Sequence, residues 1–146
     1  MKEKPVLIYI THEHEDHYDE ETLDKIIRYA QKICIPNYES AFFKKRISAR
    51  LQVTPELINE NVPQTFHDIE FKIFMDESGI NRDSAIFVKA GSLKFLDCND
   101  CKIFDRAGWL KEQCGEIDIL SSQFSGANMH PICYELKKDD YRKISR

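Results

Sequence analysis

The chain has 146 residues, of which 42% are hydrophobic and 32% are charged, and its formal net charge at pH 7 is −4. A chain of this size predicts one domain, residues 1–146, with enough apolar residues for a core of its own. The acidic balance argues against nucleic acid as a partner. No apolar run is long enough to span a membrane and none resembles a secretion signal, so the five cysteines are expected to be reduced in a cytoplasmic protein.

The first quarter of the chain predicts a strand, a helix and a second strand. Residues 5–10 form a short apolar, β-branched run that is typical of a buried strand. A helix is expected to begin at Asp19 or Glu20, because apolar residues then recur at helical spacing and acidic residues occupy the first turn. Residues 33–35 predict a short strand that ends at Pro36.

The next stretch of the chain is expected to hold two more helices. Residues 39–50 form the first of them. Thr54-Pro55-Glu56 is typical of a helix start, with Thr54 as the N-cap and Pro55 at the first helical position. The sequence from residue 51 to residue 65 otherwise has no clear pattern.

The remaining residues predict three consecutive strands followed by a further helix and strand. The strands are residues 69–75, 85–89 and 93–96, and residues 90–92 make the turn between the last two. Four more segments complete the order: a helix over residues 103–113, a buried strand over 117–120, a loop over 121–131 and the start of a polar helix over 137–146. This order of elements indicates an α/β sandwich.

The loop after the first predicted strand contains the pattern T-H-x-H-x-D-H, residues 11–17. Neutral imidazole and carboxylate are suitable ligands for Zn²⁺, Fe and Mn²⁺. In a loop that leaves a strand, His12 and His14 can turn to one metal ion while Asp16 and His17 turn to another. Two such ions can hold a hydroxide and polarise a phosphoryl or carbonyl oxygen. The alternative is a solvated acidic loop in which the histidines have no shared role.

This motif is the signature of the metallo-β-lactamase superfamily, which the chain resembles over nearly its whole length. Residues 83–88 and 94–101 resemble the strand pair that ends in the family's metal-bridging aspartate. Residues 117–127 resemble a narrower group, which contains the lactamase-like domain of CMP-N-acetylneuraminate hydroxylase and its bacterial relatives. The resemblance implies a partial metallo-β-lactamase αββα sandwich, the C-terminal portion that starts at the H-x-H-x-D-H strand. Several strands precede this loop in the family, so the domain is expected to be incomplete, without its N-terminal half.

The resemblance also implies roles for two aspartates. Asp16 matches the family residue that binds metal and takes up a proton during hydrolysis, although it can also serve as an N-cap for the following helix. Asp100 is the expected bridging ligand, because Asn99-Asp100-Cys101 matches the narrower group. Asp97, three residues earlier, is the competing candidate for the same role.

Two family ligands have no clear counterpart in this sequence. Where a third histidine is usual, after the strand over residues 69–75, the chain has Asp76-Glu77, and we expect Asp76 to replace the imidazole. The nearest histidine upstream, His67, is either a ligand or a surface turn residue. His130 lies in the region of the family's last histidine ligand, and the alternative is an exposed loop residue.

Cys98 and Cys101 form an isolated C-x-x-C pair around Asp100, which is a weak signal for a structural zinc site. We interpret both cysteines as small residues that flank the aspartate. A Rieske site needs paired C-x-H and C-x-x-H patterns, and neither occurs in the sequence. No Rieske iron–sulfur cluster is therefore expected in this chain. The expected cofactor is zinc, with iron or manganese as alternatives, because the candidate donors are imidazole and carboxylate.

These features lead to three functional hypotheses. The first is a metal-dependent hydrolase-like domain that uses a metal-bound hydroxide on a small anionic substrate, such as a sugar nucleotide or a phosphodiester, with Asp16 as the proton acceptor. The second is a catalytically inactive fragment or split half that acts as an assembly module, either as a homodimer or paired with a missing N-terminal half. The third is a nuclease of the metallo-β-lactamase type, which the acidic charge disfavours.

Overall fold

The computed structural model describes residues 4–76 and 83–122. Glu77, His130, most of the expected loop over residues 121–131 and the expected polar helix from residue 137 lie outside the described residues. Within the described part, no helix is both long and apolar enough to cross a membrane.

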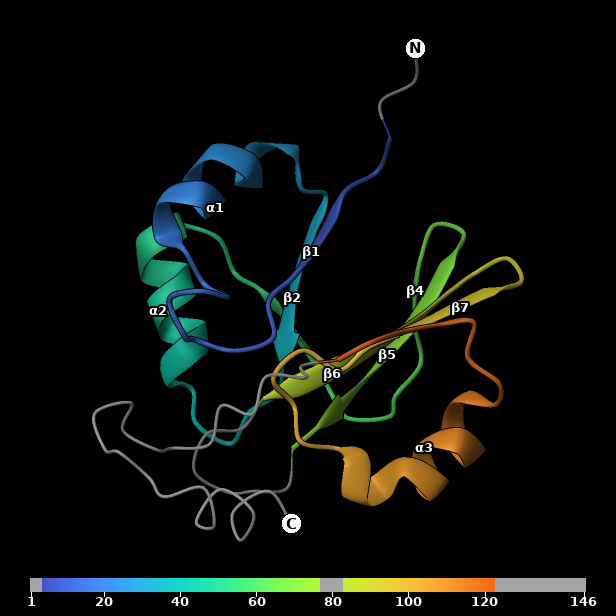
Figure 1. Ribbon diagram of the computed structural model, residues 1–146. Coiled ribbons are helices and arrows are strands. Elements are labelled where there is room, and N and C mark those ends of the chain that lie inside the picture. The colour runs from blue at the N-terminus through green and yellow to red at the C-terminus, as the bar shows by residue number, and fades with distance from the viewer. Residues whose placement is uncertain (1–3, 77–82, 123–146) are drawn as a thin grey trace, which may run out of the picture.

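The first part of the chain forms a small parallel sheet with two helices. Its strands are β1 (Leu7–Tyr9), β2 (Lys32–Pro36) and β3 (Glu56–Ile58), in the order β1-β2-β3, and both neighbouring pairs are parallel. The connections are α1 (Glu20–Ile26), followed by a 3₁₀ turn (Ile27–Tyr29), and α2 (Phe42–Leu51). Both helices lie on the same outer face of this sheet (Figure 1). The predicted strand–helix–strand–helix order is confirmed.

Asp19 begins α1 as the sequence predicts. Its side chain accepts a hydrogen bond of 2.7 Å from the backbone N–H of Thr22. Hydrogen bonding to Thr22, first through its side chain and then through this backbone N–H, lowers the pKa of Asp19. Glu20 and Glu21 then occupy the first turn, where the helix dipole favours negative charge. The expected N-cap role of Asp16 is wrong, because Asp19 occupies the cap position.

The helix predicted from Thr54-Pro55-Glu56 is wrong, since β3 begins at Glu56. Residues in β3 pair in parallel with β2, in a register that sets Leu57 opposite Ile35. The side chain of Ile58 is buried in the core. Pairing and burial in the sheet therefore outweigh the local helix-start signal, and Pro55 lies just before the strand, where its missing N–H costs no ladder hydrogen bond.

The second part of the chain forms a five-stranded sheet in the order β4-β5-β6-β7-β8. The strands are β4 (Gln64–Phe66), β5 (Ile69–Met75), β6 (Ser84–Ala90), β7 (Leu93–Asp97) and β8 (Ile119–Ser121). The first three pairs are antiparallel, whereas β7 and β8 are parallel and are connected through α3 (Ala107–Cys114). The predicted three-strand run and the following helix are confirmed, and β4 is an additional strand.

The expected burial of the last strand is wrong. In β8, the exposed fractions are 48% for Ile119 and 57% for Leu120. β8 is an edge strand that pairs only with β7 within the described part of the chain. An apolar run predicts a strand but does not say whether other elements cover it, so the pattern alone could not separate an edge strand from a central one.

The two sheets face each other and the helices cover their outer faces. Four buried residues fill the space between the sheets: Cys34, Ile58, Phe71 and Ile73. A second core lies under α1 and α2, and a third lies between the larger sheet and α3. Figure 1 shows α1 and α2 on one side of the strands and α3 on the other. This is a helix–sheet–sheet–helix order, in agreement with the predicted αββα sandwich.

Candidate metal centre

The loop that leaves β1 brings its histidines together in a tight turn. The backbone N–H groups of His17 and Tyr18 both donate to the carbonyl of His14, at 2.9 and 2.7 Å. The ring of Tyr18 is buried and packs edge-on against Phe43 of α2, with centroids 5.3 Å apart. The turn is therefore anchored to the core under α2, and its polar side chains lie at the end of β1.

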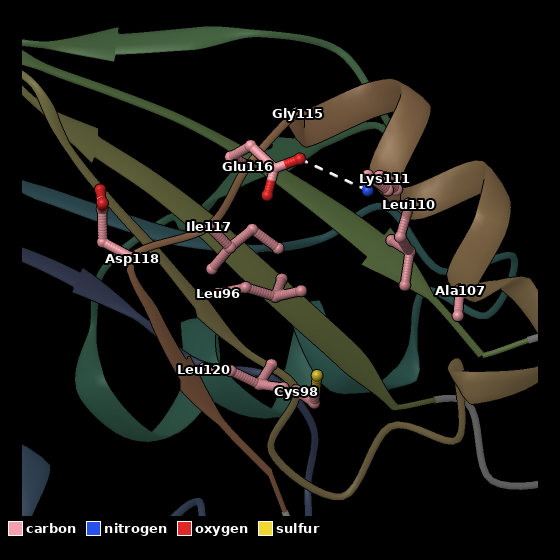
Figure 2. A pocket seen from close by; sticks show the side chains of 10 residues that line it. All are labelled: Leu96, Cys98, Ala107, Leu110, Lys111, Gly115, Glu116, Ile117, Asp118 and Leu120. Carbon is pink, nitrogen blue, oxygen red and sulfur yellow. Dashed lines mark ion pairs between the residues drawn. The ribbon is translucent and has the colours of Figure 1, made fainter.

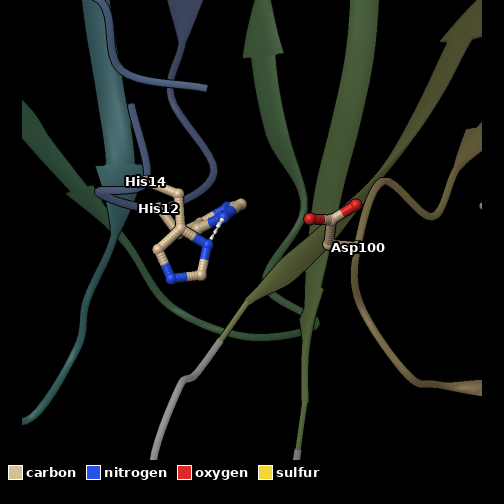
Figure 3. A group of neighbouring side chains, drawn as sticks. All are labelled: His12, His14 and Asp100. Carbon is tan, nitrogen blue, oxygen red and sulfur yellow. Dashed lines mark hydrogen bonds between the residues drawn. The ribbon is translucent and has the colours of Figure 1, made fainter. Parts of the chain in front are cut away.

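His12 and His14 form the first candidate group with Asp100 (Figure 3). Nε2 of His12 lies 2.8 Å from Nδ1 of His14, and the two rings meet edge to face with centroids 4.4 Å apart. One ligand atom from each of the three residues lies within 4.8 Å of the others. His12 is buried, His14 is exposed and Asp100 is half-buried.

Asp16 and His17 form the second candidate group, again with Asp100. Nε2 of His17 lies 3.4 Å from an oxygen of Asp16 and 3.3 Å from Oδ2 of Asp100. The rings of His12 and His17 lie 4.4 Å apart, so the two groups are neighbours. The structure thus places the four motif residues that were predicted as ligands around one small region.

Asp100 is the residue that both groups share, and Asp97 belongs to neither. The chain turns sharply after β7, where Asn99 has a positive φ of 50°. The carboxylate of Asp97 accepts a hydrogen bond of 3.1 Å from the backbone N–H of Asn99 and so stabilises this turn. Cys101 closes it with a backbone hydrogen bond to Cys98. Asp97 therefore shapes the turn that presents Asp100.

The other predicted ligands do not join these groups. Asp76 is buried at the end of β5, where its backbone N–H donates to the carbonyl of Asp83, and it belongs to neither group. His67 lies in the turn before β5, with Nε2 3.1 Å from Oε1 of Gln31. A metal role for Asp76 stays a prediction, and the surface-turn interpretation of His67 agrees with its position.

Asp83 contacts the candidate centre although the sequence assigned it no ligand role. Its buried Oδ1 lies 3.0 Å from Nδ1 of His12. Thr11 approaches the same nitrogen through Oγ1, also at 3.0 Å, and that hydroxyl accepts a hydrogen bond of 2.6 Å from the side-chain amide of Asn99. The only signal in the sequence was the position of Asp83 at the start of a strand, which many aspartates share.

The cysteines that flank Asp100 are buried thiols. Burial raises the pKa of Cys98 to about 11 and raises the pKa of Cys101 further. The Cys101 thiol lies near the carbonyl oxygens of Phe74 and Asp83. Among the described residues, no cysteine belongs to either candidate group. Their interpretation as small packing residues agrees with these positions.

The donor set fits a pair of metal ions. It consists of imidazole nitrogens and carboxylate oxygens, which are suitable ligands for zinc, iron and manganese. Two nitrogens bound to one tetrahedral zinc ion lie about 3.4 Å apart, given Zn–N bonds of about 2.0–2.1 Å. The 2.8 Å separation between His12 Nε2 and His14 Nδ1 is slightly shorter, so a small rotation of the exposed His14 ring would admit an ion.

A separate cavity of about 390 Å³ lies between α3, β7 and β8. Figure 2 shows apolar side chains around it, among them Leu96, Leu110 and Leu120, and an ion pair of 3.4 Å between Lys111 and Glu116 beside it. None of its lining residues belongs to either candidate group. The cavity and the candidate metal centre are therefore different features of the molecule.

Comparison with solved structures defines the fold. CmlA, a diiron β-hydroxylase from Streptomyces venezuelae, superposes with a TM-score of 0.67 and 15% sequence identity over 82% of this chain. A single-residue variant of CmlA β-hydroxylase superposes with a TM-score of 0.72 and 16% identity, also over 82%. The chain carries part of the metallo-β-lactamase fold. It covers 25–26% of the CmlA chains, and at this low identity the likeness concerns the fold alone.

Comparison with curated protein sequences finds relatives whose names differ from that of the similar solved structures. Proteins of Mycobacterium tuberculosis and Mycolicibacterium smegmatis, provisionally named Rieske 2Fe-2S iron–sulfur proteins, are 24% and 23% identical over 136 residues. The match includes 88% of this chain, which spans about a quarter, 26%, of the length of these relatives. No protein-family model matches the chain. At this identity and coverage, the names of these relatives do not define what this chain does.

Proposed function

We propose that this chain is a metal-dependent enzyme domain with a dinuclear centre. His12 and His14 would hold one ion, Asp16 and His17 the other, and Asp100 would bridge them. The observation that carries this proposal is the position of Asp100, which is shared by both groups and offers each of them a carboxylate oxygen within 4.8 Å of the other ligand atoms. The fold supports it, because the similar CmlA structures are those of a metal-dependent enzyme of the same fold.

The proposed reaction is hydrolysis of a small anionic substrate, such as a sugar nucleotide or a phosphodiester. Two ions in this position would lower the pKa of a bound water molecule and polarise a phosphoryl or carbonyl oxygen. Asp16 is suited to accept the proton, because its side chain is 76% exposed and adjoins His17. The sugar nucleotide is proposed from the sequence alone, because residues 117–127 resemble the group that contains the lactamase-like domain of CMP-N-acetylneuraminate hydroxylase.

An iron-dependent hydroxylation is the second candidate function. Its support is that the similar solved structure is named a diiron β-hydroxylase, and that the donor atoms in this chain are nitrogen and oxygen rather than thiolate sulfur. The two candidates differ in the required metal and in the co-substrate. Zinc suffices for hydrolysis, whereas hydroxylation requires iron, molecular oxygen and a reductant.

Metal loading of the full chain tests both candidates. Metal-free protein is incubated with Zn²⁺, or with Fe²⁺ under anaerobic conditions, and metal content is measured after removal of the excess. The zinc form is then assayed for hydrolysis of bis(4-nitrophenyl) phosphate and of a CMP-sugar, and the iron form for reductant-dependent oxygen uptake.

Asp16→Asn and Glu15→Gln form a matched pair of variants in this assay, because both residues are exposed and adjacent. Asp16→Asn is expected to abolish hydrolysis, and Glu15→Gln is expected to leave it unchanged. A chain that retains neither metal would contradict the proposal and favour the assembly module, for which the exposed Ile119 and Leu120 offer an edge.

A further inference from the structure

Asp83, the residue before β6, is a buried carboxylate beside the candidate metal centre. Its Oδ1 accepts a hydrogen bond of 2.6 Å from the backbone N–H of Ser84 and lies 3.0 Å from Nδ1 of His12. Its Oδ2 is also buried and has no hydrogen-bond partner in the part of the chain that the structure describes. A buried carboxylate is costly unless a donor or a positive charge compensates it, so the position of Asp83 requires an explanation.

The contacts of Nδ1 indicate where the His12 ring carries its proton. An ionised carboxylate only accepts hydrogen bonds, so an unprotonated Nδ1 would bring two acceptors to 3.0 Å with no proton between them. The contact is favourable when Nδ1–H donates to Asp83. In the neutral ring, Nε2 then keeps its lone pair, and this nitrogen is the one that faces His14 at 2.8 Å.

We infer that Asp83 is a positioning residue, whose carboxylate holds His12 in the Nδ1–H tautomer and presents Nε2 to a metal ion. This inference rests on the proposed function, because it gives His12 a supporting partner within the dinuclear centre. A histidine ligand that donates its other N–H to a carboxylate is held in orientation and becomes more basic. A metal ion held at Nε2 would also supply positive charge near the buried carboxylate of Asp83.

Ser84 supports the same loop without contacting the imidazole. Its hydroxyl oxygen lies 3.2 Å from the carbonyl oxygen of Thr11 and 2.6 Å from the hydroxyl of Tyr9. The hydroxyl of Tyr38 also donates to the Thr11 carbonyl. Ser84→Ala therefore loosens the backbone of the loop but leaves Nδ1 of His12 and its two contacts in place. It is a matched control for Asp83, since the two residues are adjacent and both are buried.

The test combines ¹⁵N NMR of the histidine rings with titration of Zn²⁺ against a competing chelator, on the metal-free full chain. Spectra are recorded above the usual histidine pKa of about 6.5, so that the tautomer of the neutral ring is observed. The wild-type chain is expected to show Nδ1–H for His12. Asp83→Ala should shift His12 toward Nε2–H and weaken binding of the first Zn²⁺ by about 10–100-fold.

Asp83→Asn should rescue most of this loss. The Ser84 N–H keeps the amide oxygen at the Oδ1 position, where it still accepts from Nδ1–H. Ser84→Ala should retain the Nδ1–H tautomer and bind Zn²⁺ within a few-fold of the wild type. An Nε2–H tautomer in the wild-type chain would overturn the inference even if the Asp83 variants do not fold.

Two outcomes separate this inference from the proposed function. A wild-type chain that binds no Zn²⁺ contradicts the proposed function and the role of Asp83 together. A wild-type chain that binds Zn²⁺ as tightly as Asp83→Ala, with the same His12 tautomer in both, contradicts the role of Asp83 alone.

Discussion

His12 and His17 lie in the same turn, with rings 4.4 Å apart, but their surroundings differ. His12 is buried, and Asp83 and Thr11 contact its Nδ1, whereas its Nε2 faces His14. The side chain of His17 is 21% exposed, and its Nε2 contacts two carboxylates, one of which, Asp16, is largely in solvent. We therefore expect the ion on His12 to be held more tightly, and the ion on His17 to exchange more readily and to be the one that a substrate reaches.

Asp100→Ala should have the largest effect on metal binding, because this carboxylate belongs to both groups. We expect the second ion to be lost, and affinity for the first to fall by more than the roughly 10–100-fold that removal of a supporting partner costs. The matched control is Asp97→Ala, which removes the turn-stabilising hydrogen bond to Asn99. Metal retained after dialysis is the measurement, and a larger loss from Asp97→Ala would reverse the assignment.

Replacing each histidine separately tests the difference between the two groups. His17→Ala should leave one ion per chain after desalting, because the His12 group keeps its ligands. His12→Ala should lose the tighter ion and also destabilise the fold by about 1–3 kcal/mol, since it removes the contact partner of the buried Asp83. Metal analysis and urea unfolding measure these effects. Equal metal loss in both variants, with equal free energies of unfolding, would contradict the expected difference between the His12 and His17 groups.

Ile47→Ala tests whether the centre depends on its local contacts or on overall stability. Ile47 is fully buried in the core under α2, with Ile10 and Tyr18 from either side of the metal loop. The cavity should lower the free energy of unfolding by about 2–5 kcal/mol. The folded variant should still bind the same number of ions, measured by metal analysis at low urea. Loss of one ion from folded Ile47→Ala would show that the contacts of Asp83 and Thr11 do not suffice to position the ligands without the packing under α2.

Loss of the Cys98 thiol should have the smallest effect on metal binding, because both candidate groups offer only nitrogen and oxygen donors. Its raised pKa of about 11, compared with 9.0 for an unperturbed thiol, keeps it protonated at neutral pH. The corresponding contribution to stability is present below about pH 9 and is lost as the pH rises to about 11. Iodoacetamide should label Cys98 in folded protein slowly below this range. Rapid labelling at neutral pH that bound Zn²⁺ prevents would instead make Cys98 a ligand.

The sequence predicts much of the site because the motif is local. His12, His14, Asp16 and His17 lie within six residues, so the turn after β1 is enough to bring them together. Asp100 required the family resemblance, because no local pattern distinguishes it from Asp97. Asp83 could not be found in this way, since its contact with His12 joins residues 71 positions apart and exists only when β6 packs in the folded sheet.

The wrong predictions about secondary structure and burial have a similar cause. Thr54-Pro55-Glu56 carries a genuine local helix signal, but parallel pairing with β2 makes the following residues a strand. Ile119 and Leu120 carry a genuine strand signal, but whether an edge strand is covered depends on elements elsewhere in the fold. Local patterns therefore identified most elements, whereas burial and pairing required the tertiary structure.

The most direct test of the dinuclear centre is anomalous X-ray diffraction from crystals of the full chain loaded with Zn²⁺ or, anaerobically, with Fe²⁺. We predict two anomalous peaks on opposite sides of Asp100, one bound by His12 and His14 and the other by Asp16 and His17, with the first more fully occupied. A single peak that Asp100 does not contact, a peak on Cys98 and Cys101, or no peak in this loop would contradict the assignment.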